Sequence, residues 1–248
     1  MNAAGSPAVS PQTAQRWVLP QTNSTAASIL AQSAGLPLIV AELLAERGVR
    51  SAAEADIFLH PRLEHLLDPY DMQGMAEAVS RVQAAIAGQE LILIYGDYDV
   101  DGTTAIVLLK TALEMLGGKV DFHAPHRLRE GYGMQAEVLV AAAAQGVRLV
   151  ISVDTGIRDF AAAEAAARLG LDLIVTDHHL PHADLPLALV VLNPNQTGCG
   201  YACKHLCGAG VAFKLAQALL EAWDLDRTRG KILPSFLKIG RASCRERV

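Results

Sequence analysis

The sequence has no excess of basic residues, no long apolar run and few cysteines, and each shortage argues against a class of protein. Lys and Arg number 21 against 26 Asp and Glu, so the formal net charge of −5 lacks the basic footprint of many nucleic-acid-binding domains. No apolar run reaches the roughly 18 residues needed to cross a bilayer, and residues 1–20 lack the apolar core of a signal peptide. Four cysteines are too few for a disulfide scaffold. These features predict a cytoplasmic protein.

Composition and hydrophobic pattern change along the 248 residues. Residues 1–15, rich in Ala, Ser, Pro and Gln, predict a disordered tail. Residues 16–75 predict short helices, one of which starts at a capping box formed by Ser51 and Glu54. From residue 76 to 238, short apolar strands alternate with helices that end at glycines. This alternation predicts an α/β fold, a doubly wound parallel sheet preceded by a small helical N-terminal region.

Acidic residues and histidines follow three of the predicted strands, at the point where each strand ends. The strands are 91–95, 149–153 and 171–176, and the residues that follow them are Asp97, Asp99, Asp101, Asp154, Asp177, His178 and His179. In a doubly wound sheet the ligand site lies beyond the carboxyl ends of the strands. Carboxylate oxygens combined with imidazole suit Mn²⁺, Mg²⁺ or Zn²⁺. The sequence therefore predicts the site of a metal-dependent hydrolase at one edge of the sheet.

The first cluster places three carboxylates, Asp97, Asp99 and Asp101, within five residues. Between a buried strand and a helix start, their mutual repulsion is costly without cations. If strand geometry continues through them, alternation turns all three side chains the same way. A solvated surface loop and an EF-hand-like calcium loop are the alternatives, although the latter lacks its expected Glu at the twelfth position. Carboxylates that hold cations are less negative than their formal charge, so the net charge is a weak argument against a phosphate-bearing substrate.

The second and third clusters, Asp154 and Asp177 to His179, support a metal site chiefly because they follow strands in the same way as the first cluster does. Asp154 alone is also the kind of residue that caps a following helix. The adjacent imidazoles of His178 and His179 are either structural, or one metal ligand and one group that faces the substrate.

A basic loop with two glycines, 126–133, follows another predicted strand at the same edge. It is either a solvated turn or a phosphate-binding loop. In the second case His126, Arg127 and Arg129 are the candidate phosphate-binding residues, because guanidinium groups offer a fork of donors.

Cys199, Cys203 and Cys207 lie close to His205 in the sequence. Their spacing does not match the paired hooks of structural zinc sites, and no second pair exists. Structural zinc and reduced cysteines that pack in the core are the two interpretations, and the spacing favours the second.

Together these motifs resemble the DHH phosphoesterase superfamily, named for the triplet found here at 177–179, and within it the RecJ family of bacterial exonucleases. The resemblance runs from about residue 16 to 238. The segments that carry it are Arg16–Pro20, Tyr95–Thr104, Pro125–Arg127, Glu130–Gly133, Ser152–Gly156, Thr176–His179, Asn193–Pro194 and Leu206–Lys214.

The resemblance implies a 5′-to-3′ exonuclease that hydrolyses the phosphodiester bonds of single-stranded DNA in recombination and repair. It implies Mn²⁺ or Mg²⁺ in a two-metal site, and as partners single-stranded DNA, a repair helicase and a single-strand-binding protein. The implied metal ligands are Asp97, Asp99, Asp101, Asp154 and His178, with Asp154 bridging two ions. The implied catalytic residues are His179, which would contact the scissile phosphate, and Asp177. Arg127 would hold a substrate phosphate.

Two other functions stay open on this sequence. One is a DHH-type phosphatase that acts on pyrophosphate or short oligonucleotides, and the other is a non-catalytic relative that binds nucleic acid. A nicotinamide cofactor is disfavoured, because no Gly-x-Gly-x-x-Gly turn follows the first strand of the predicted sheet.

The end of the chain departs from the family pattern. Family members continue beyond a segment like Leu233–Lys238 with an Ala-Asp motif that holds a further metal ligand, a second nucleic-acid-binding domain and an OB-fold. Residues 239–248 resemble instead a translated sequencing-adapter read-through, which predicts a non-native tail. We therefore expect a truncated phosphoesterase domain over 76–238, with weak or no exonuclease activity.

Overall fold

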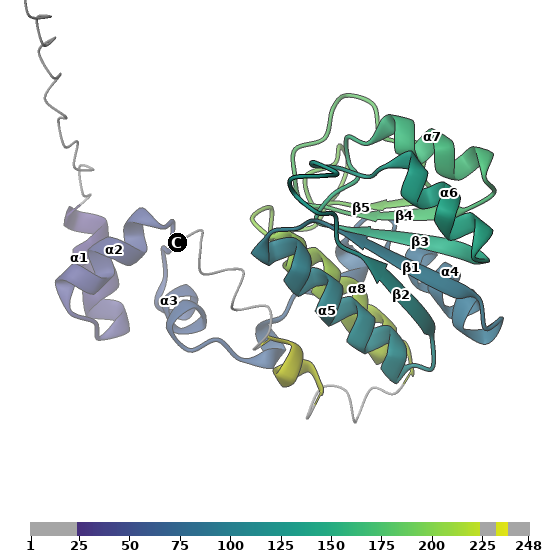
Figure 1. Ribbon diagram of the computed structural model, residues 1–248. Coiled ribbons are helices and arrows are strands. Elements are labelled where there is room, and N and C mark those ends of the chain that lie inside the picture. The colour runs from purple at the N-terminus through teal and green to yellow at the C-terminus, as the bar shows by residue number, and fades with distance from the viewer. Residues whose placement is uncertain (1–23, 224–231, 238–248) are drawn as a thin grey trace, which may run out of the picture. The chain divides into compact units, whose positions relative to one another are not determined.

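The computed structural model describes residues 24–223 and 232–237 of the chain (Figure 1). Two compact units divide between His65 and Leu66. The predicted tail at 1–15, the motif at 16–20 and the predicted non-native segment at 239–248 lie outside the described residues. No single described helix is long and apolar enough to cross a membrane, although 25–34 and 38–46, bent by 117°, pass that test of length and composition together.

The described part of the first unit, residues 24–65, contains three short α-helices. They are α1 (Ser24–Ala34), α2 (Leu38–Glu46) and α3 (Ala52–Leu59), followed by the 3-10 turn η1 (Leu63–His65). Its small core contains Leu30, Ala41 and Leu44. The hydroxyl of Ser51 accepts a hydrogen bond from the backbone N–H of Glu54 at 3.2 Å, which confirms the predicted helix start.

The second unit contains a parallel sheet of five strands in the order β2-β1-β3-β4-β5 (Figure 1). The strands are β1 (Leu91–Gly96), β2 (Lys119–His123), β3 (Val147–Val153), β4 (Asp172–Thr176) and β5 (Val190–Leu192). From β1 the chain first forms β2 on one side and then crosses to form β3 on the other side. The boundary between β1 and β3 is therefore the topological switch point, where doubly wound folds place their ligands. The predicted fold class is confirmed.

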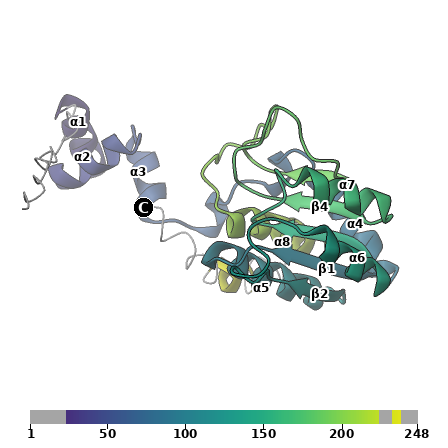
Figure 2. The ribbon, with the colours of Figure 1, turned by 45° about the horizontal axis from the view of Figure 1, so that its top comes forward.

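Helices cover both faces of this sheet (Figures 1 and 2). The helices with described bounds in the second unit are η2 (Pro69–Asp71), α4 (Met75–Ala87), α5 (Val100–Met115), α6 (Ala136–Ala144), α7 (Phe160–Arg168) and α8 (Gly208–Trp223), and residues 233–237 are also helical. Ile92 and Ile94 of β1 belong to the core shared with α4, α5 and α8. Leu93 and Tyr95 belong to the core shared with α6 and α7. Alternation along the strand therefore separates the two cores.

Two helices of the site begin at residues held by carboxylates. α5 begins at Val100, because Asp99 caps it: its side chain accepts a hydrogen bond from the Gly102 N–H at 2.9 Å. α8 begins at Gly208, where its first N–H groups bind a carboxylate from α5. The strand geometry that would align the three carboxylates of the first cluster does not continue, since β1 ends at Gly96. The condition on which the common orientation depended is therefore not met.

Candidate active site

Three paired strand ends bring the acidic clusters together. Gly96 of β1 is in register with Val153 of β3, which is in turn in register with Thr176 of β4. The next residues along these strands are Asp97, Asp154 and Asp177, all of them buried. The predicted convergence at one edge of the sheet follows directly from this register.

Asp154 is the most constrained residue of the cluster. Its side chain is 1% exposed, its backbone has φ +60°, and its Oδ1 accepts no hydrogen bond from the described residues. Nε2 of His178 lies 3.2 Å from Oδ1, and a Cβ added to Gly208 would lie 2.2 Å from the same oxygen. A buried, unbonded carboxylate oxygen on strained backbone is characteristic of a functional site.

Potential metal ligands gather around Asp154 in two overlapping groups. One group is Asp97, Asp99 and Asp154, and the other is Asp154, His178 and His179. In each group one ligand atom per residue lies within 4.8 Å of the others. Carboxylate oxygens and imidazole nitrogens form a donor set that Mn²⁺ accepts readily.

Negative charge and burial dominate the electrostatics of the site, and the charge of His179 offsets them only in part. Burial raises the pKa of Asp154 to about 9, and the negative charges of Asp101, Asp99 and Asp177 add to the effect. Burial also raises the pKa of Asp97, with a further contribution from Asp99. A divalent cation would reverse both shifts, because it is the largest local charge in such sites. The residues therefore fit a bound cation.

Asp101 has a different environment from the other carboxylates. Its two oxygens accept hydrogen bonds from the backbone N–H groups of Gly208 (2.7 Å) and Ala209 (2.8 Å), at the start of α8. Its Oδ2 also lies 3.7 Å from Nε2 of His178. In this structure Asp101 thus joins two helices at the border of the site, and its role as a metal ligand stays a prediction.

Asp177 orients His179. Its Oδ1 lies 2.7 Å from Nδ1 of His179 and accepts hydrogen bonds from the N–H groups of His178 and His179, while Oδ2 accepts from the N–H of Ile157 at 3.1 Å. Burial alone would raise the pKa of Asp177, but the hydrogen bond and charge of His179 and the backbone donors outweigh it and lower the pKa. An ionised Asp177 therefore fixes the orientation of the His179 imidazole through Nδ1.

Two asparagines that sequence reasoning gave no role hold the histidine backbone. The side-chain amide of Asn193 donates to the carbonyl of His179 at 2.9 Å, and that of Asn195 donates to the carbonyl of His178 at 2.8 Å. The signal that could have identified them is the Asn-Pro-Asn sequence directly after the last strand.

The basic loop contributes one of its three predicted residues to the neighbourhood of the first cluster. The guanidinium of Arg127 lies over the ring of Tyr98, 5.2 Å from the ring centroid. Tyr98 is the residue between Asp97 and Asp99 in the sequence. His126 and Arg129 are exposed. Glu130 fixes the loop, because it accepts from the N–H of His126 and its carboxylate lies 2.7 Å from Nε2 of His123. The predicted roles of His126, Arg127 and Arg129 in phosphate binding stay predictions.

Tyr132 is a site residue that the sequence reading did not single out. Its ring meets that of His179 edge-on, with centroids 6.4 Å apart. Burial raises its pKa, with further contributions from Asp177, Asp97 and Asp154, so the hydroxyl stays protonated beside the acidic cluster.

The cysteines have the character of packing residues. Cys199, Cys203 and Cys207 are reduced, and Cys199 and Cys207 are buried members of the core. Within residues 24–223 and 232–237, no group of three potential metal ligands includes a cysteine. The burial of Cys199 and Cys207 fits packing residues, and the expectation that no structural zinc is bound here stays a prediction.

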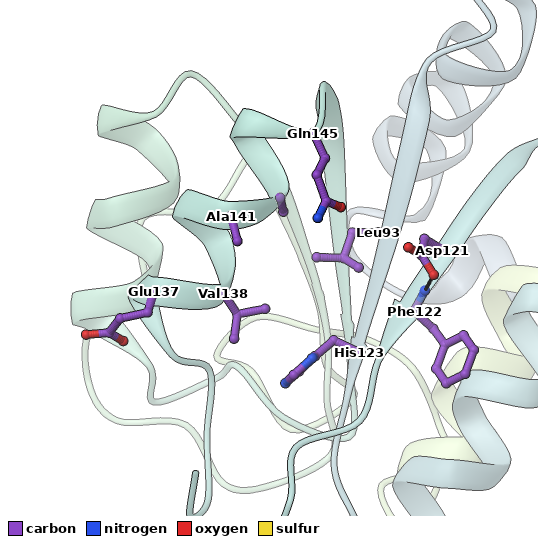
Figure 3. A pocket seen from close by; sticks show the side chains of 9 residues that line it. Leu93, Asp121, Phe122, His123, Glu137, Val138, Ala141 and Gln145 are labelled. Atoms are coloured by element: carbon purple, nitrogen blue, oxygen red, sulfur yellow. Dashed lines mark hydrogen bonds between the residues drawn. The ribbon is translucent and has the colours of Figure 1, made fainter.

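Two of the hollows formed by described residues of the second unit bear on the search for a site. One, of about 570 Å³, opens beside the histidines and is lined by His178, His179, Leu180, Asn195, Lys204, His205 and Leu206. The other, of about 440 Å³, lies between β2 and α6, where Leu93, His123 and Val138 extend into it (Figure 3). Its lining residues include none of the predicted site residues.

The fold and this site define a doubly wound α/β protein with a carboxylate–imidazole cluster suited to divalent cations at its strand ends. The chain belongs to the DHH family: the profile of the DHH family, N-terminal domain, matches residues 91–238.

Comparison with known proteins confirms the resemblance to RecJ. The chain is 42% identical over 205 residues to the single-stranded-DNA-specific exonuclease RecJ of Bacillus subtilis, which covers 83% of the chain and 26% of that protein. It is 40% identical over 187 residues to RecJ of Escherichia coli, and this match covers 75% of the chain and 32% of that protein. The chain thus spans about a quarter to a third of the length of these relatives.

Solved structures of RecJ proteins have a fold similar to that of this chain. A crystal structure of exonuclease RecJ bound to manganese matches with a TM-score of 0.64 and 32% identity, covering 72% of this chain and 45% of that one. RecJ of Thermus thermophilus in complex with Mn²⁺ matches with a TM-score of 0.68 and 27% identity, and the match covers 87% of this chain and 30% of that one.

Proposed function

We propose that this chain carries the metal site of a divalent-metal-dependent exonuclease that degrades single-stranded DNA from 5′ to 3′ in recombination and repair. One observation carries the proposal: the buried Asp154 carboxylate, with an unbonded oxygen and a raised pKa, shares a cluster of potential ligands with Asp97, Asp99, His178 and His179. The relatives named as single-stranded-DNA-specific exonucleases support the substrate. The direction and the repair role come from the family resemblance.

The cation is Mn²⁺ or Mg²⁺ in this proposal, and relatives of solved structure are described as bound to manganese. Asp97, Asp99, Asp154 and His178 would hold it, and Asp101, 3.7 Å from His178, borders the same site. When bound, a cation polarises a phosphoryl oxygen and lowers the pKa of water, and a pair of cations does so for both the attacking and the leaving oxygen.

The chain's own residues bind and orient the phosphate. His179, whose Nδ1–H is held by the Asp177 carboxylate, presents Nε2–H to a phosphate oxygen when the ring is protonated, because only the imidazolium donates from both nitrogens. The edge of Tyr132 limits how far that imidazole can turn. Arg127, stacked on Tyr98, offers a fork of donors to a neighbouring phosphate of the strand. Single-stranded DNA is the partner that these contacts fit, and a repair helicase and a single-strand-binding protein are the partners expected from the family.

Two measurements test the proposal. Calorimetry should show Mn²⁺ binding to the chain that Asp154→Ala abolishes and that Asp184→Ala, at an exposed carboxylate outside the site, leaves intact. Digestion of single-stranded DNA labelled at the 5′ or the 3′ end should show Mn²⁺-dependent loss of the 5′ label first with a full-length relative, and the same order, at a much lower rate, in any digestion by this chain. Hydrolysis of pyrophosphate without degradation of long single strands would support a phosphatase instead. Nucleic-acid binding without metal binding would favour a non-catalytic relative.

A further inference from the structure

The hollow beside the two histidines has the lining of an anion-compatible pocket. None of its seven lining side chains is acidic, and Lys204 and three histidines are among them. The hollow between β2 and α6 is the opposite case, because Asp121 and Glu137 line it and no Lys or Arg does (Figure 3). Of the two, only the hollow at the histidines suits part of a polyanionic ligand.

Two parts of the lining of this hollow are held by hydrogen bonds to backbone carbonyls. The Lys204 ammonium donates to the carbonyls of Pro194 (2.7 Å) and Cys199 (2.8 Å), which fixes the loop before α8. At another lining residue, Leu180, Nε and Nη2 of Arg158 donate to the backbone carbonyl, at 2.9 and 2.6 Å. A pocket whose walls are already fixed loses little entropy when a ligand enters.

Two side chains on these walls have their surfaces open to a ligand. Leu180 is 67% exposed, and His205 is exposed. Neither has a place in the metal cluster. A flat heteroaromatic base stacks on an aromatic ring, histidine included, and packs against an aliphatic side chain. The volume of about 570 Å³ lies within the range of small-ligand pockets.

We propose that this hollow binds the base of the nucleotide whose phosphate lies at His179, with His205 stacked on one face of the base and Leu180 covering it. This inference rests on the proposed function, since it takes the phosphate at His179 as given. It gives a role to part of the segment 199–207, which the cysteine spacing marked in the sequence: residues 204–206 line the nucleotide pocket. Stacking makes no use of base edges, so the pocket accepts all four bases.

The experiment separates the base from the phosphate. In Mn²⁺, thymidine 5′-monophosphate and the base-free 2-deoxyribose 5-phosphate are titrated calorimetrically into the wild-type chain and into His205→Ala, His205→Phe and Leu180→Ala. His60→Ala and Leu187→Ala are matched controls, because both side chains are exposed and neither lines the hollow.

The wild-type chain should bind the nucleotide roughly ten-fold more tightly than the sugar phosphate, the size expected of one stacked base. His205→Ala should bring this ratio close to one, Leu180→Ala should lower it several-fold, and His205→Phe and both controls should keep it. Equal affinity for the two compounds in the wild-type chain, or an unchanged ratio in His205→Ala, overturns the pocket while the phosphate site stands. If the wild-type chain binds neither compound, both this inference and the proposed function fail.

Discussion

The carboxylate of Asp101 accepts a hydrogen bond from the backbone N–H of Gly208 at 2.7 Å, across 107 residues of sequence. Its other oxygen accepts from the next N–H, that of Ala209. The first acidic cluster is therefore joined to the start of α8, where the helix dipole favours a negative charge. This link places Gly208 against the Asp154 carboxylate and so positions the back wall of the metal site.

Replacing Asp101 with Ala should destabilise the second unit. Two N–H groups at the start of α8 would lose their acceptor, and each unpaired buried donor costs about 1–3 kcal/mol. Urea denaturation measures the change in the free energy of unfolding. Asp101→Asn, which keeps one carbonyl acceptor, should lose less, and the exposed Asp184→Ala should lose almost nothing. Equal stability of Asp101→Ala and Asp184→Ala would show that the link carries little energy.

Gly208 should not tolerate a side chain. A Cβ there would lie 2.2 Å from Oδ1 of Asp154 and 2.4 Å from its Cγ, so Gly208→Ala must displace either α8 or the carboxylate. We expect a loss of about 1–3 kcal/mol, typical of overpacking, together with weaker Mn²⁺ binding. Gly200→Ala is the control, because nothing lies within 4 Å of a Cβ at that position. Normal Mn²⁺ affinity in Gly208→Ala would contradict the proposed closeness of α8 to the metal site.

Asp154→Asn should stabilise the metal-free protein and abolish its stabilisation by Mn²⁺. The substitution removes a buried group that is crowded by Asp101, Asp99 and Asp177, and the same carboxylate is the central ligand candidate. The melting temperature in chelator tests the stability of the metal-free protein, and the melting temperature in Mn²⁺ tests the stabilisation by the metal. The wild type should gain several degrees with saturating Mn²⁺, since a ligand that binds the folded state alone at 100 times its Kd adds roughly 2.7 kcal/mol. An equal gain in Asp154→Asn would remove Asp154 from the ligand set.

Asp177→Asn should lower kcat far more than it raises KM in any digestion that the chain supports. The variant keeps the shape but loses the charge that fixes the tautomer of His179, as expected of a positioning residue. General acid–base contributions are typically about 10²–10⁴-fold, which bounds the loss of kcat. Mn²⁺ binding should be retained, which separates this effect from damage to the metal cluster. Loss of Mn²⁺ binding would make Asp177 part of the metal site instead.

The elements and the edge that carries the site were predictable, because they depend on local pattern. Apolar strands that end in Asp97, Asp154 and Asp177 suffice to place three carboxylates at one edge once the sheet is parallel. The different orientation of Asp101 was not predictable, because it depends on Gly208, which lies on a helix far along the chain.

The roles of Asn193 and Asn195 escaped prediction for the same reason. Their amides bind carbonyls 14 and 17 residues earlier, and no periodicity marks such contacts. Sequence pattern reports which faces are buried, but not which polar groups meet across the fold.

Lys214 should make the stability of the protein depend on pH in the alkaline range. This ammonium group is 4% exposed and donates to the carbonyl of Leu67 at 2.7 Å and to Oε1 of Gln217 at 2.9 Å. Burial lowers its pKa from 10.5 to about 8, although the charges of Glu221 and Asp68 raise it in part. Between pH 8 and 10.5 the unfolded chain therefore holds a proton that the folded chain has released, so this group makes the free energy of unfolding rise with pH there.

The comparison with Lys214→Met isolates this effect. The substitution leaves the Leu67 carbonyl without its donor, which costs about the same at every pH, and removes the titration. The wild type should therefore gain on the order of 2–3 kcal/mol relative to Lys214→Met between pH 7 and pH 10.5, from a pKa shift of that size. Denaturation of both proteins in parallel across this range measures the difference, in which the titration of all other groups cancels. A constant difference would mean that Lys214 keeps its ordinary pKa despite its burial, and that its two hydrogen bonds fully offset the loss of water.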